Sequence, residues 1–223
     1  MSCAEPEYYT KIYEETKKRW AHERRECKAL ELGFRILYSP PCDSPKLLLI
    51  GLQPGRDEKR KDRDKAQQQM DGWPAENEFA TEDWCLAKRT RELVDVGALR
   101  ASMAMDAIFF RSPNDDQWEK IPRETRKGLK EFCLERTKSI IDRAKPSLIM
   151  AIGLGTFSML TKEQGKLELP NNRQNRRLVV SGSVQGFPLI GIRHPTGKQA
   201  LSSEDWNSMT NNLPKILKRF YNK

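Results

Sequence analysis

Residues 47–55 read LLLIGLQPG, a continuous aliphatic run that ends in a turn rich in glycine and proline. Four consecutive aliphatic residues are typical of a strand that is buried on both faces of a parallel sheet, because a half-exposed strand alternates with polar residues. In the turn, Gly51 and Gly55 allow close approach of the backbone and Pro54 stiffens it. The stretch therefore predicts a central strand, and it holds Gln53 at the mouth of the sheet.

Four other short apolar runs are predicted to be strands, because residues that break secondary structure bound each of them. They are 107–110, 147–152, 178–180 and 189–192. A clear helix begins at Pro122, and its apolar residues recur at helical spacing: Leu129, Phe132, Cys133, Ile140, Ile141 and Ala144. Strands that alternate with helices predict an α/β fold with three α/β/α layers and a central, mostly parallel sheet. In such sheets, ligands bind at the carboxyl ends of the strands.

The two ends of the chain are predicted to be helical. Residues 8–30 form a charged amphipathic pattern with these side chains near its apolar face: Tyr9, Ile12, Tyr13 and Trp20. Residues 204–221 also show one apolar face, and Pro214 is expected to kink or divide that helix. The length favours a single domain over residues 1–223, with an N-terminal helical extension at about 1–38.

The composition is that of a soluble globular protein, with 37% hydrophobic and 32% charged residues. No apolar run approaches the roughly 20 residues that cross a bilayer. The N-terminus also lacks the basic start and the apolar stretch of a secretory signal. We therefore expect a cytoplasmic protein without a membrane partner.

The cysteines argue against a metal site. They are odd in number and include no CxxC pair: Cys3, Cys27, Cys42, Cys85 and Cys133. This pattern disfavours a disulfide framework, a zinc site and an iron–sulfur site. We expect reduced thiols, no metal and no other cofactor.

The net charge of the chain suits a polyanionic partner. It is +9 at pH 7, with 40 Lys and Arg against 31 Asp and Glu. DNA is one such partner, but many basic proteins bind nothing anionic. Charge alone therefore leaves both readings open.

Polar residues follow the other predicted strands as well. RSPN follows 107–110, and a Gly-x-Gly stretch that lacks the third glycine of a dinucleotide fingerprint follows 147–152, so NAD binding is not predicted. The last strand ends in RHPTGKQ, in which His194 is one of two histidines, the other being His22. A lone histidine is more often structural, but one at the carboxyl end of a strand is well placed for chemistry.

Together, these motifs resemble the uracil-DNA glycosylase superfamily in order and spacing. The GLQPG turn, the RSPN stretch, the KPSLIMAIG strand and the RHPTG loop carry the resemblance, which covers about residues 46–199. It implies a monofunctional DNA glycosylase that flips a base out of DNA and hydrolyses its N-glycosidic bond, leaving an abasic site. It also implies that Gln53 positions the attacking water, that His194 binds a pyrimidine oxygen, and that Thr196 stands in place of the usual serine. The branch with an iron–sulfur cluster is not indicated, because the cysteine pairs are absent.

The resemblance assigns further residues to the base. The turn residues Gly51, Leu52, Pro54 and Gly55 are expected to line the base site. Asp106 joins them or serves as a strand-start or cap residue. Two aromatic residues, Trp73 and Phe79, are candidates to stack on the flipped base unless both belong to the core. Asn114 either presents its amide to a base edge or caps a turn.

Contacts with DNA are expected from the RSPN stretch, from the last motif and from the basic run 171–177. The residues concerned are Arg111, Arg193, Pro195, Thr196, Gly197, Lys198, Gln199, Arg173, Arg176 and Arg177. Solvated loops are the alternative for the last motif. We expect the protein to act as a monomer.

Gln53 departs from the residue types that activate water strongly, because a neutral amide cannot be a strong general base. The chain is then slow on uracil, specialised for a damaged or modified pyrimidine such as hypermodified cytosine in phage DNA, or inactive. Its role is in DNA repair or in defence against foreign DNA. Two alternatives stand beside the enzyme: a non-catalytic nucleic-acid-binding protein with the same fold, and an α/β protein that binds a free nucleotide or phosphate-bearing metabolite at the GLQPG turn.

Overall fold

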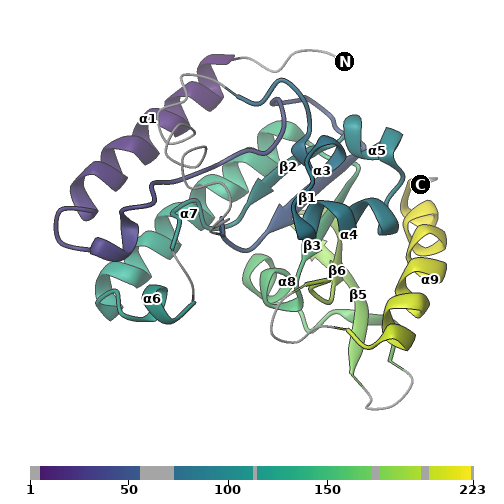
Figure 1. Cartoon of the computed structure of the whole chain (residues 1–223). Coiled ribbons are helices and arrows are strands. Elements are labelled where there is room, and N and C mark those ends of the chain that lie inside the picture. Colours follow the sequence, from purple (N-terminus) through teal and green to yellow (C-terminus); the bar gives the residue numbers. More distant parts are fainter. Residues whose placement is uncertain (1–5, 56–72, 113–114, 172–175, 197–200, 222–223) are drawn as a thin grey trace.

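A central sheet organises the chain (Figure 1). The computed structural model describes residues 6–55, 73–112, 115–171, 176–196 and 201–221, and within them a six-stranded sheet has the order β2-β1-β3-β6-β5-β4. The strands are β1 (Leu47–Gly51), β2 (Met103–Asp106), β3 (Leu148–Ile152), β4 (Lys166–Pro170), β5 (Arg177–Val184) and β6 (Phe187–Ile192). Strands β2, β1, β3 and β6 are mutually parallel, and β5 and β4 are added antiparallel on one side.

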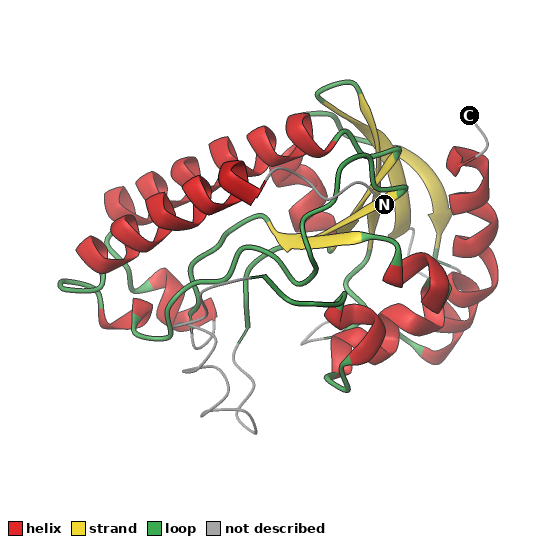
Figure 2. Cartoon of the chain, turned by 90° about the horizontal axis from the view of Figure 1, so that it is seen from above, coloured by secondary structure: helices red, strands yellow, loops and turns green. Residues whose placement is uncertain are grey.

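Helices cover both faces of this sheet, which explains the continuous apolar runs of the central strands (Figures 1 and 2). On one face pack α1 (Pro6–Glu23), α7 (Arg123–Ala144) and α8 (Leu154–Leu160), and on the other α3 (Glu78–Thr81), α4 (Cys85–Leu93), α5 (Val96–Arg100) and α9 (Ser203–Tyr221). In β1, Leu48 lies in the first core cluster and Leu49 in the second, and both are fully buried. The predicted α/β class, with a mostly parallel sheet flanked by helices, is confirmed.

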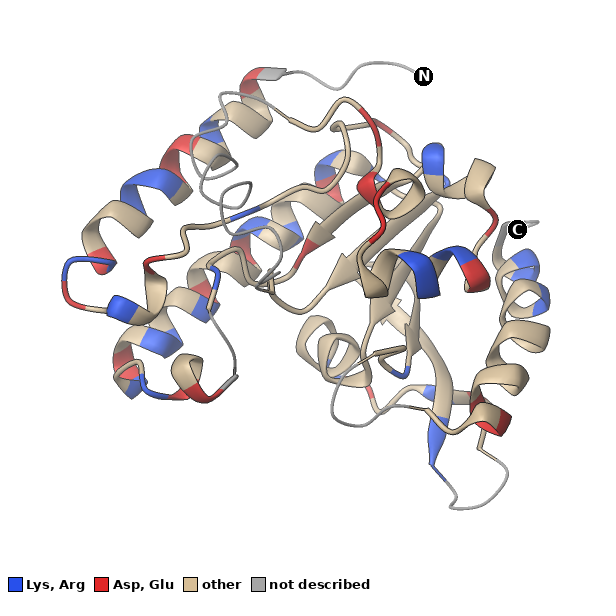
Figure 3. Cartoon of the chain, in the orientation of Figure 1, with Lys and Arg blue, Asp and Glu red and all other residues tan. Residues whose placement is uncertain are grey.

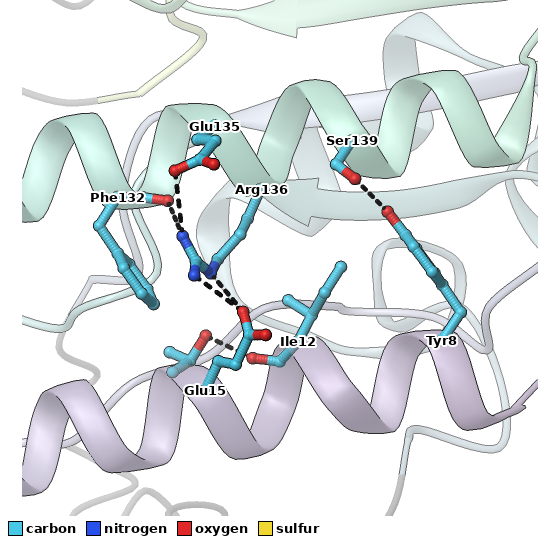
Figure 4. A network of polar contacts seen from close by, with 8 residues as sticks. Tyr8, Ile12, Glu15, Phe132, Glu135, Arg136 and Ser139 are labelled. Atoms are coloured by element: carbon cyan, nitrogen blue, oxygen red, sulfur yellow. Dashed lines mark hydrogen bonds and ion pairs between the residues drawn. The ribbon is translucent and has the colours of Figure 1, made fainter.

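The N-terminal helix lies along α7, and polar contacts join the two helices (Figure 4). Arg136 of α7 donates two hydrogen bonds to Oε2 of Glu15, at 2.8 and 3.0 Å. The hydroxyl of Tyr8 lies 2.5 Å from Oγ of Ser139. Next to these contacts Tyr9 is fully buried, so α1 contributes to the main core cluster.

The first helix ends earlier than the sequence predicts. It stops at Glu23, and a 3-10 turn, η1 (Lys28–Leu30), follows after an exposed charged stretch at 24–26. The residues at 24–26 are all charged and exposed, so a helix continued through them would gain no apolar contact from these side chains. The chain turns back instead, and Nε1 of Trp20 donates to the carbonyl of Leu30 at 2.8 Å.

The segment 33–38 covers the outer edge of β2. It runs antiparallel to β2 and to the chain that follows it, through one isolated bridge with Met105 and one with Phe110, and the amide of Tyr38 donates to the carbonyl of Ala104 at 2.8 Å. An uncovered edge would expose a row of unpaired backbone groups. The segment therefore closes the sheet on this side and brings its side chains over the end of β2.

The second strand lies earlier than predicted. The strand β2 ends at Asp106, and 107–110 continues as buried chain outside it. The stretch from β2 to Phe110 is apolar apart from Asp106, so hydropathy alone does not locate the boundary. The strand pairing with β1 ends at Gly51 and Asp106, although the amide of Ile108 still donates to the carbonyl of Leu52. Asp106 is therefore the last residue of β2 and not a residue before the strand.

The antiparallel part of the sheet is larger than predicted. The strand β4 was not expected, because its residues are partly exposed and lack a buried run, with Leu167 at 47% exposure. Strands β5 and β6 extend beyond their apolar centres and form a hairpin. Its turn consists of Gln185 and Gly186, whose φ angles of 52° and 83° suit the right-handed twist of a two-residue hairpin.

The last helix is continuous through Pro214, so the expectation that this residue divides it is wrong, whereas the alternative, a kink, stays a prediction. Proline removes one backbone hydrogen bond from a helix interior. Here Leu213 before it and Ile216 after it are both buried against the sheet. Packing on both sides of Pro214 outweighs the missing hydrogen bond.

Three further features complete the description, and each concerns the described residues only. None of their helices has the length and hydropathy that a bilayer-spanning helix needs. Their four cysteines are free thiols: Cys27, Cys42, Cys85 and Cys133. A short helix, α6 (Asp115–Glu119), precedes α7.

Candidate functional site

The topology places a switch point between β1 and β3. After β1 the chain continues to β2 on one side, and β3 is then added on the other side of β1. In open α/β sheets, ligands bind outside the carboxyl ends of the strands at such a point. Gln53 follows β1 and His194 follows β6, and β3 lies between these two strands. Neighbouring strands are about 4.8 Å apart, so the ends of β1 and β6 are separated by roughly 10 Å.

The turn after β1 lies tight against the end of β2. Gly51 is paired in register with Asp106, and a Cβ atom at position 51 would lie 2.1 Å from Oδ1 of Asp106. The turn is anchored by the amide of Ile108, which donates to the carbonyl of Leu52 at 2.9 Å. Pro54 is buried, whereas the Leu52 side chain is 40% exposed. The turn thus presents its side chains from a fixed backbone.

Gln53 is held by the chain that follows β2. Its Nε2 donates to the carbonyl of Phe110 at 2.8 Å, and the residue is half-buried. This bond uses an amide N–H, so Oε1 is the atom of the side chain that can accept a hydrogen bond from water. A neutral amide orients a water molecule but does not remove its proton. The Gln53 side chain therefore offers an acceptor to water, and its role as a water-positioning residue stays a prediction.

His194 lies against the end of β3. Gly153 has a φ of +100°, and a Cβ atom there would lie 3.6 Å from Cδ2 of the His194 ring. The amide of Gly153 donates to the carbonyl of Ile192 at 2.9 Å, which joins the ends of β3 and β6. Gly153 is the residue that follows β3. Because it has no side chain, no side chain at this position lies between the β1 turn and His194.

The described contacts of the His194 ring engage Nδ1. This nitrogen lies 2.5 Å from the carbonyl oxygen of Thr196 and 3.2 Å from its amide nitrogen. The contact with the carbonyl needs a proton on Nδ1, and the contact with the amide needs a lone pair there, so the role of Nδ1 depends on the tautomer of the ring. Nε2 donates to a ligand when it carries a proton and accepts when the only ring proton is on Nδ1.

Asp106 is the buried carboxyl of this edge. It is 6% exposed, and the hydroxyl of Tyr38 donates to its Oδ2 at 2.7 Å. Burial raises the pKa of Asp106 to about 6, although the hydrogen bond from Tyr38 and the charges of Arg35 and Arg111 act to lower it. A titratable group with a shifted pKa at the ligand-binding edge of a sheet is a candidate for function.

The sequence did not point to Tyr38 and Arg35, which lie outside every recognised motif. The Arg35 guanidinium lies 4.2 Å from the centre of the Tyr38 ring and pairs with Glu78 of α3. The one available signal was the pattern FRILY at 34–38, in which an arginine interrupts an apolar run. A buried cation in an edge strand suggests a buried anion nearby.

The two candidate stacking aromatics lie in core clusters. Trp73 packs edge-on against Tyr9 and Tyr13, with ring centres 6.3 and 5.9 Å away. Phe79 is 3% exposed and packs against Tyr38 and Trp84. Both positions agree with the core alternative, and the ring faces of Phe79 are not open to a stacked base.

Three described arginines lie at the same edge as His194. Because β5 is antiparallel to β6, its first residues lie beside the last residues of β6, and Arg176 and Arg177 are exposed there. The third arginine is Arg193. Its backbone is fixed by its amide, which donates to the carbonyl of Leu178 at 2.7 Å. Figure 3 shows positive charge at the start of β5. These residues form the arginine edge of the molecule: Arg176, Arg177 and Arg193.

The remaining expected contacts differ in their placement. Arg111 is 4% exposed and its Nη1 donates to the carbonyl of Gly55 at 3.3 Å, so it braces the β1 turn from the interior. Pro195 is buried and Thr196 is half-buried beside His194. The other expected residues lie outside the described part of the chain: Asn114, Arg173, Gly197, Lys198 and Gln199.

The described ranges contain no group of three or more His, Cys, Asp and Glu side chains that could hold a metal ion. Comparison with known proteins adds no further assignment. No protein-family model matches the chain, and no curated protein is significantly similar to it.

Proposed function

We propose that this chain is a monofunctional DNA glycosylase with a fold like that of the uracil-DNA glycosylase superfamily. It extrudes a pyrimidine-type base from DNA and hydrolyses the N-glycosidic bond. The observation that supports this proposal most strongly is the position of Gln53 and His194, which follow β1 and β6 on either side of Gly153. In this proposal a water-orienting amide and a hydrogen-bond donor act at one switch point of the sheet.

The leaving base develops negative charge as the bond breaks. An N–H donor that is already in place stabilises such charge without reorganisation, as in an oxyanion hole. The proposal requires that the His194 ring carries a proton on Nε2 and supplies this donor, while its contacts with Thr196 fix the plane of the ring. In this proposal His194 acts on the leaving group and not on water.

The sugar develops positive charge and is attacked by water. Gln53 orients that water through Oε1 while Nε2 stays bonded to the carbonyl of Phe110. Because the amide does not take a proton, most of the rate enhancement comes from the leaving-group side and from the geometry of the bound water. A base that leaves readily, such as a damaged or modified pyrimidine, suits this arrangement best.

DNA is the proposed partner because positive charge lies beside the site. Flipping a base out of the stack costs a few kcal/mol, which contacts with the DNA backbone must offset. The arginine edge offers three cations at the end of β6, next to His194. The whole chain carries a net charge of +9, which favours a polyanion over its full surface.

A non-catalytic DNA-binding protein is the second candidate. One observation favours it: the water-positioning place holds a neutral amide that is already bonded to the carbonyl of Phe110. Such a chain would keep the fold and the arginine edge and would bind DNA without releasing a base.

Base release separates the two candidates. Purified protein is incubated with duplex and single-stranded oligonucleotides that carry uracil, mismatches, damaged bases or phage-type modified cytosines, and abasic sites are then counted. The proposed function predicts abasic sites with at least one of these bases and their loss in His194→Ala. The matched control is His22→Ala, because His22 lies in α1 and is the only other histidine of the chain. Tight binding without release from any DNA would favour the non-catalytic protein.

A further inference from the structure

Three parts of the chain meet at the carboxyl group of Asp106. The residue ends β2, Gly51 of the β1 turn lies beside it, and Tyr38 reaches it from the edge segment 33–38. Its two oxygens face different neighbours. Oδ2 accepts a hydrogen bond from the Tyr38 hydroxyl at 2.7 Å. Oδ1 lies 2.1 Å from the position that a Cβ atom on Gly51 would occupy. Oδ1 is therefore the oxygen on the β1 side of the carboxyl group, and the switch point lies between β1 and its other neighbour, β3.

Tyr38 has little freedom to move its hydroxyl. Its amide donates to the carbonyl of Ala104, and its own carbonyl accepts from the amide of Glu78, each at 2.8 Å. Arg35 lies 4.2 Å from the ring centre and pairs with Glu78. The ring is also packed against Phe79, and Tyr38 as a whole is 4% exposed. The hydroxyl is therefore fixed by backbone bonds, by ring packing and by an ion pair.

We infer that Tyr38 is a positioning residue that holds Asp106 so that Oδ1 alone is offered toward the switch point. Oδ1 accepts a hydrogen bond when the carboxyl is ionised and donates one when it is protonated. While the phenol donates to Oδ2, the acid proton belongs on Oδ1. The hydrogen-bonding character of this one atom therefore depends on pH.

This behaviour bears on the class of base, and that part of the inference rests on the proposed function. An ionised carboxylate accepts from an exocyclic amino group, as cytosine-type bases carry, but it repels a carbonyl oxygen. A protonated carboxyl donates to a carbonyl oxygen, as uracil-type bases carry. The site thus favours amino-bearing bases at a pH above the pKa of Asp106, and carbonyl-bearing bases at a pH below it.

The charged groups around Asp106 influence the pH at which its carboxyl group gains or loses a proton. Arg35 of the edge segment and Arg111 after β2 favour the ionised form, and Glu78 of α3 neutralises part of the charge of Arg35. The Gly51 turn contributes no charge of its own. Burial opposes these cations, and the pKa of Asp106 is raised to about 6.

The positioning role is tested first without any DNA. In the chain labelled with ¹³Cγ aspartate, the signal lost in Asp106→Asn identifies Asp106, and its shift is followed from pH 4 to pH 8. In Tyr38→Phe, loss of the donor to the carboxylate should raise the proton affinity of Asp106 about tenfold. Tyr8→Phe is the matched control, because it removes a tyrosine hydrogen bond between α1 and α7. Equal midpoints in Tyr38→Phe and the wild type would overturn the inference.

A second measurement needs no variant of Tyr38. In the wild-type chain labelled with ¹³Cζ tyrosine, the Tyr38 signal should titrate with the same midpoint as Asp106, because the phenol is bonded to the titrating group. A Tyr38 signal that does not move through this range would overturn the inference, even if Tyr38→Phe fails to fold.

The class of base is tested by release from duplexes that carry a cytosine-type or a uracil-type base at one position. From pH 5 to pH 7.5, the rate ratio should move toward the amino-bearing base by about tenfold in the wild type, and it should stay constant in Asp106→Asn. The same pH dependence in both proteins would overturn the assignment. Release from neither base at any pH would overturn the proposed function instead, and the two titrations would still decide the role of Tyr38.

Discussion

Oδ1 of Asp106 occupies the place where a side chain of residue 51 would begin. A Cβ atom on Gly51 would lie 2.1 Å from this oxygen, and the two residues are register partners in adjacent parallel strands. No real Cβ atom approaches an oxygen so closely. Glycine is therefore required at this position by close approach to a carboxyl group.

Gly51→Ala should destabilise the protein through this contact. Either the Asp106 carboxyl or the β1 turn must move, and overpacking of a core of this kind costs about 1–3 kcal/mol. The free energy of unfolding, measured with urea, checks the value. Gly55→Ala is the matched control, because a Cβ atom there would meet nothing within 4 Å. Equal stability of the two variants would contradict the described packing.

Asp106→Asn should stabilise the protein at high pH. Burial raises the pKa of Asp106 from 3.8 to about 6, so the folded state binds its proton more tightly than the unfolded state does. The stability contributed by this proton is present below pH 4 and is lost as the pH rises through 6. The ionised carboxylate then costs about 3 kcal/mol above pH 7, and a neutral amide of the same shape avoids most of that cost.

The measurement for Asp106→Asn is the free energy of unfolding at pH 4 and at pH 8, for the variant and for the wild type. The two proteins should differ little at pH 4, and the variant should be more stable at pH 8. A stability gain that is equal at both pH values would show that proton binding to Asp106 is not its cause.

Glu168 should anchor the last helix through a contact that disappears in acid. Burial acts to raise its pKa, but hydrogen bonds from Ser181 and Arg219, each 2.7 Å long, lower it below 4.5. A lowered pKa means that the stabilisation is present above about pH 4.5 and is lost as the pH falls further. Because Arg219 is 59% exposed, solvent weakens the pair, and Glu168→Gln should cost only about 1 kcal/mol at pH 7.

The loss of stability in Glu168→Gln is measured by thermal unfolding at pH 7 and at pH 3. The variant should be less stable than the wild type at pH 7 alone. The control is Glu92→Gln in α4, which also removes a contact with α9: Glu92 accepts from Nε1 of Trp206 of that helix but is 49% exposed. An equal effect of both substitutions would contradict the special role of Glu168.

The arginine edge should determine part of the salt dependence of DNA binding. Each phosphate contact that is lost reduces the slope of log K against log salt concentration by about 0.9. Arg176→Ala combined with Arg177→Ala should therefore weaken binding and reduce this slope by about 2. The control is Lys215→Ala combined with Lys218→Ala, which removes two exposed cations from α9. Equal slopes for the two double variants would exclude the arginine edge as a specific contact.

The central strands were predictable because local hydropathy determines them. In β1 and β3 every residue is buried, since helices cover both faces, and so the sequence shows an uninterrupted apolar run. The boundary of β2 was not predictable, because the chain beyond Asp106 is as buried as the strand itself. It depends on where the strand pairing with β1 ends, which is a contact between residues distant in sequence.

The candidate site was predictable only as far as its residues follow strands. Gln53 and His194 follow from that rule and from the motif resemblance. The contact of Tyr38 with Asp106 joins residues 68 positions apart, and no local pattern encodes it. Trp73 and Phe79 were ambiguous for the same reason, because an aromatic residue in a core and one in a base site look alike in sequence.

The rate at which free base is released from DNA under single-turnover conditions tests the central claim most directly. The wild type is compared with Gln53→Ala and His194→Ala, with His22→Ala as the control, on whichever base of the panel yields abasic sites. We predict a fall of about 100-fold or more in His194→Ala, a smaller fall in Gln53→Ala and no change in His22→Ala. Base release that survives both substitutions, or no release by the wild type from any DNA, would contradict the account.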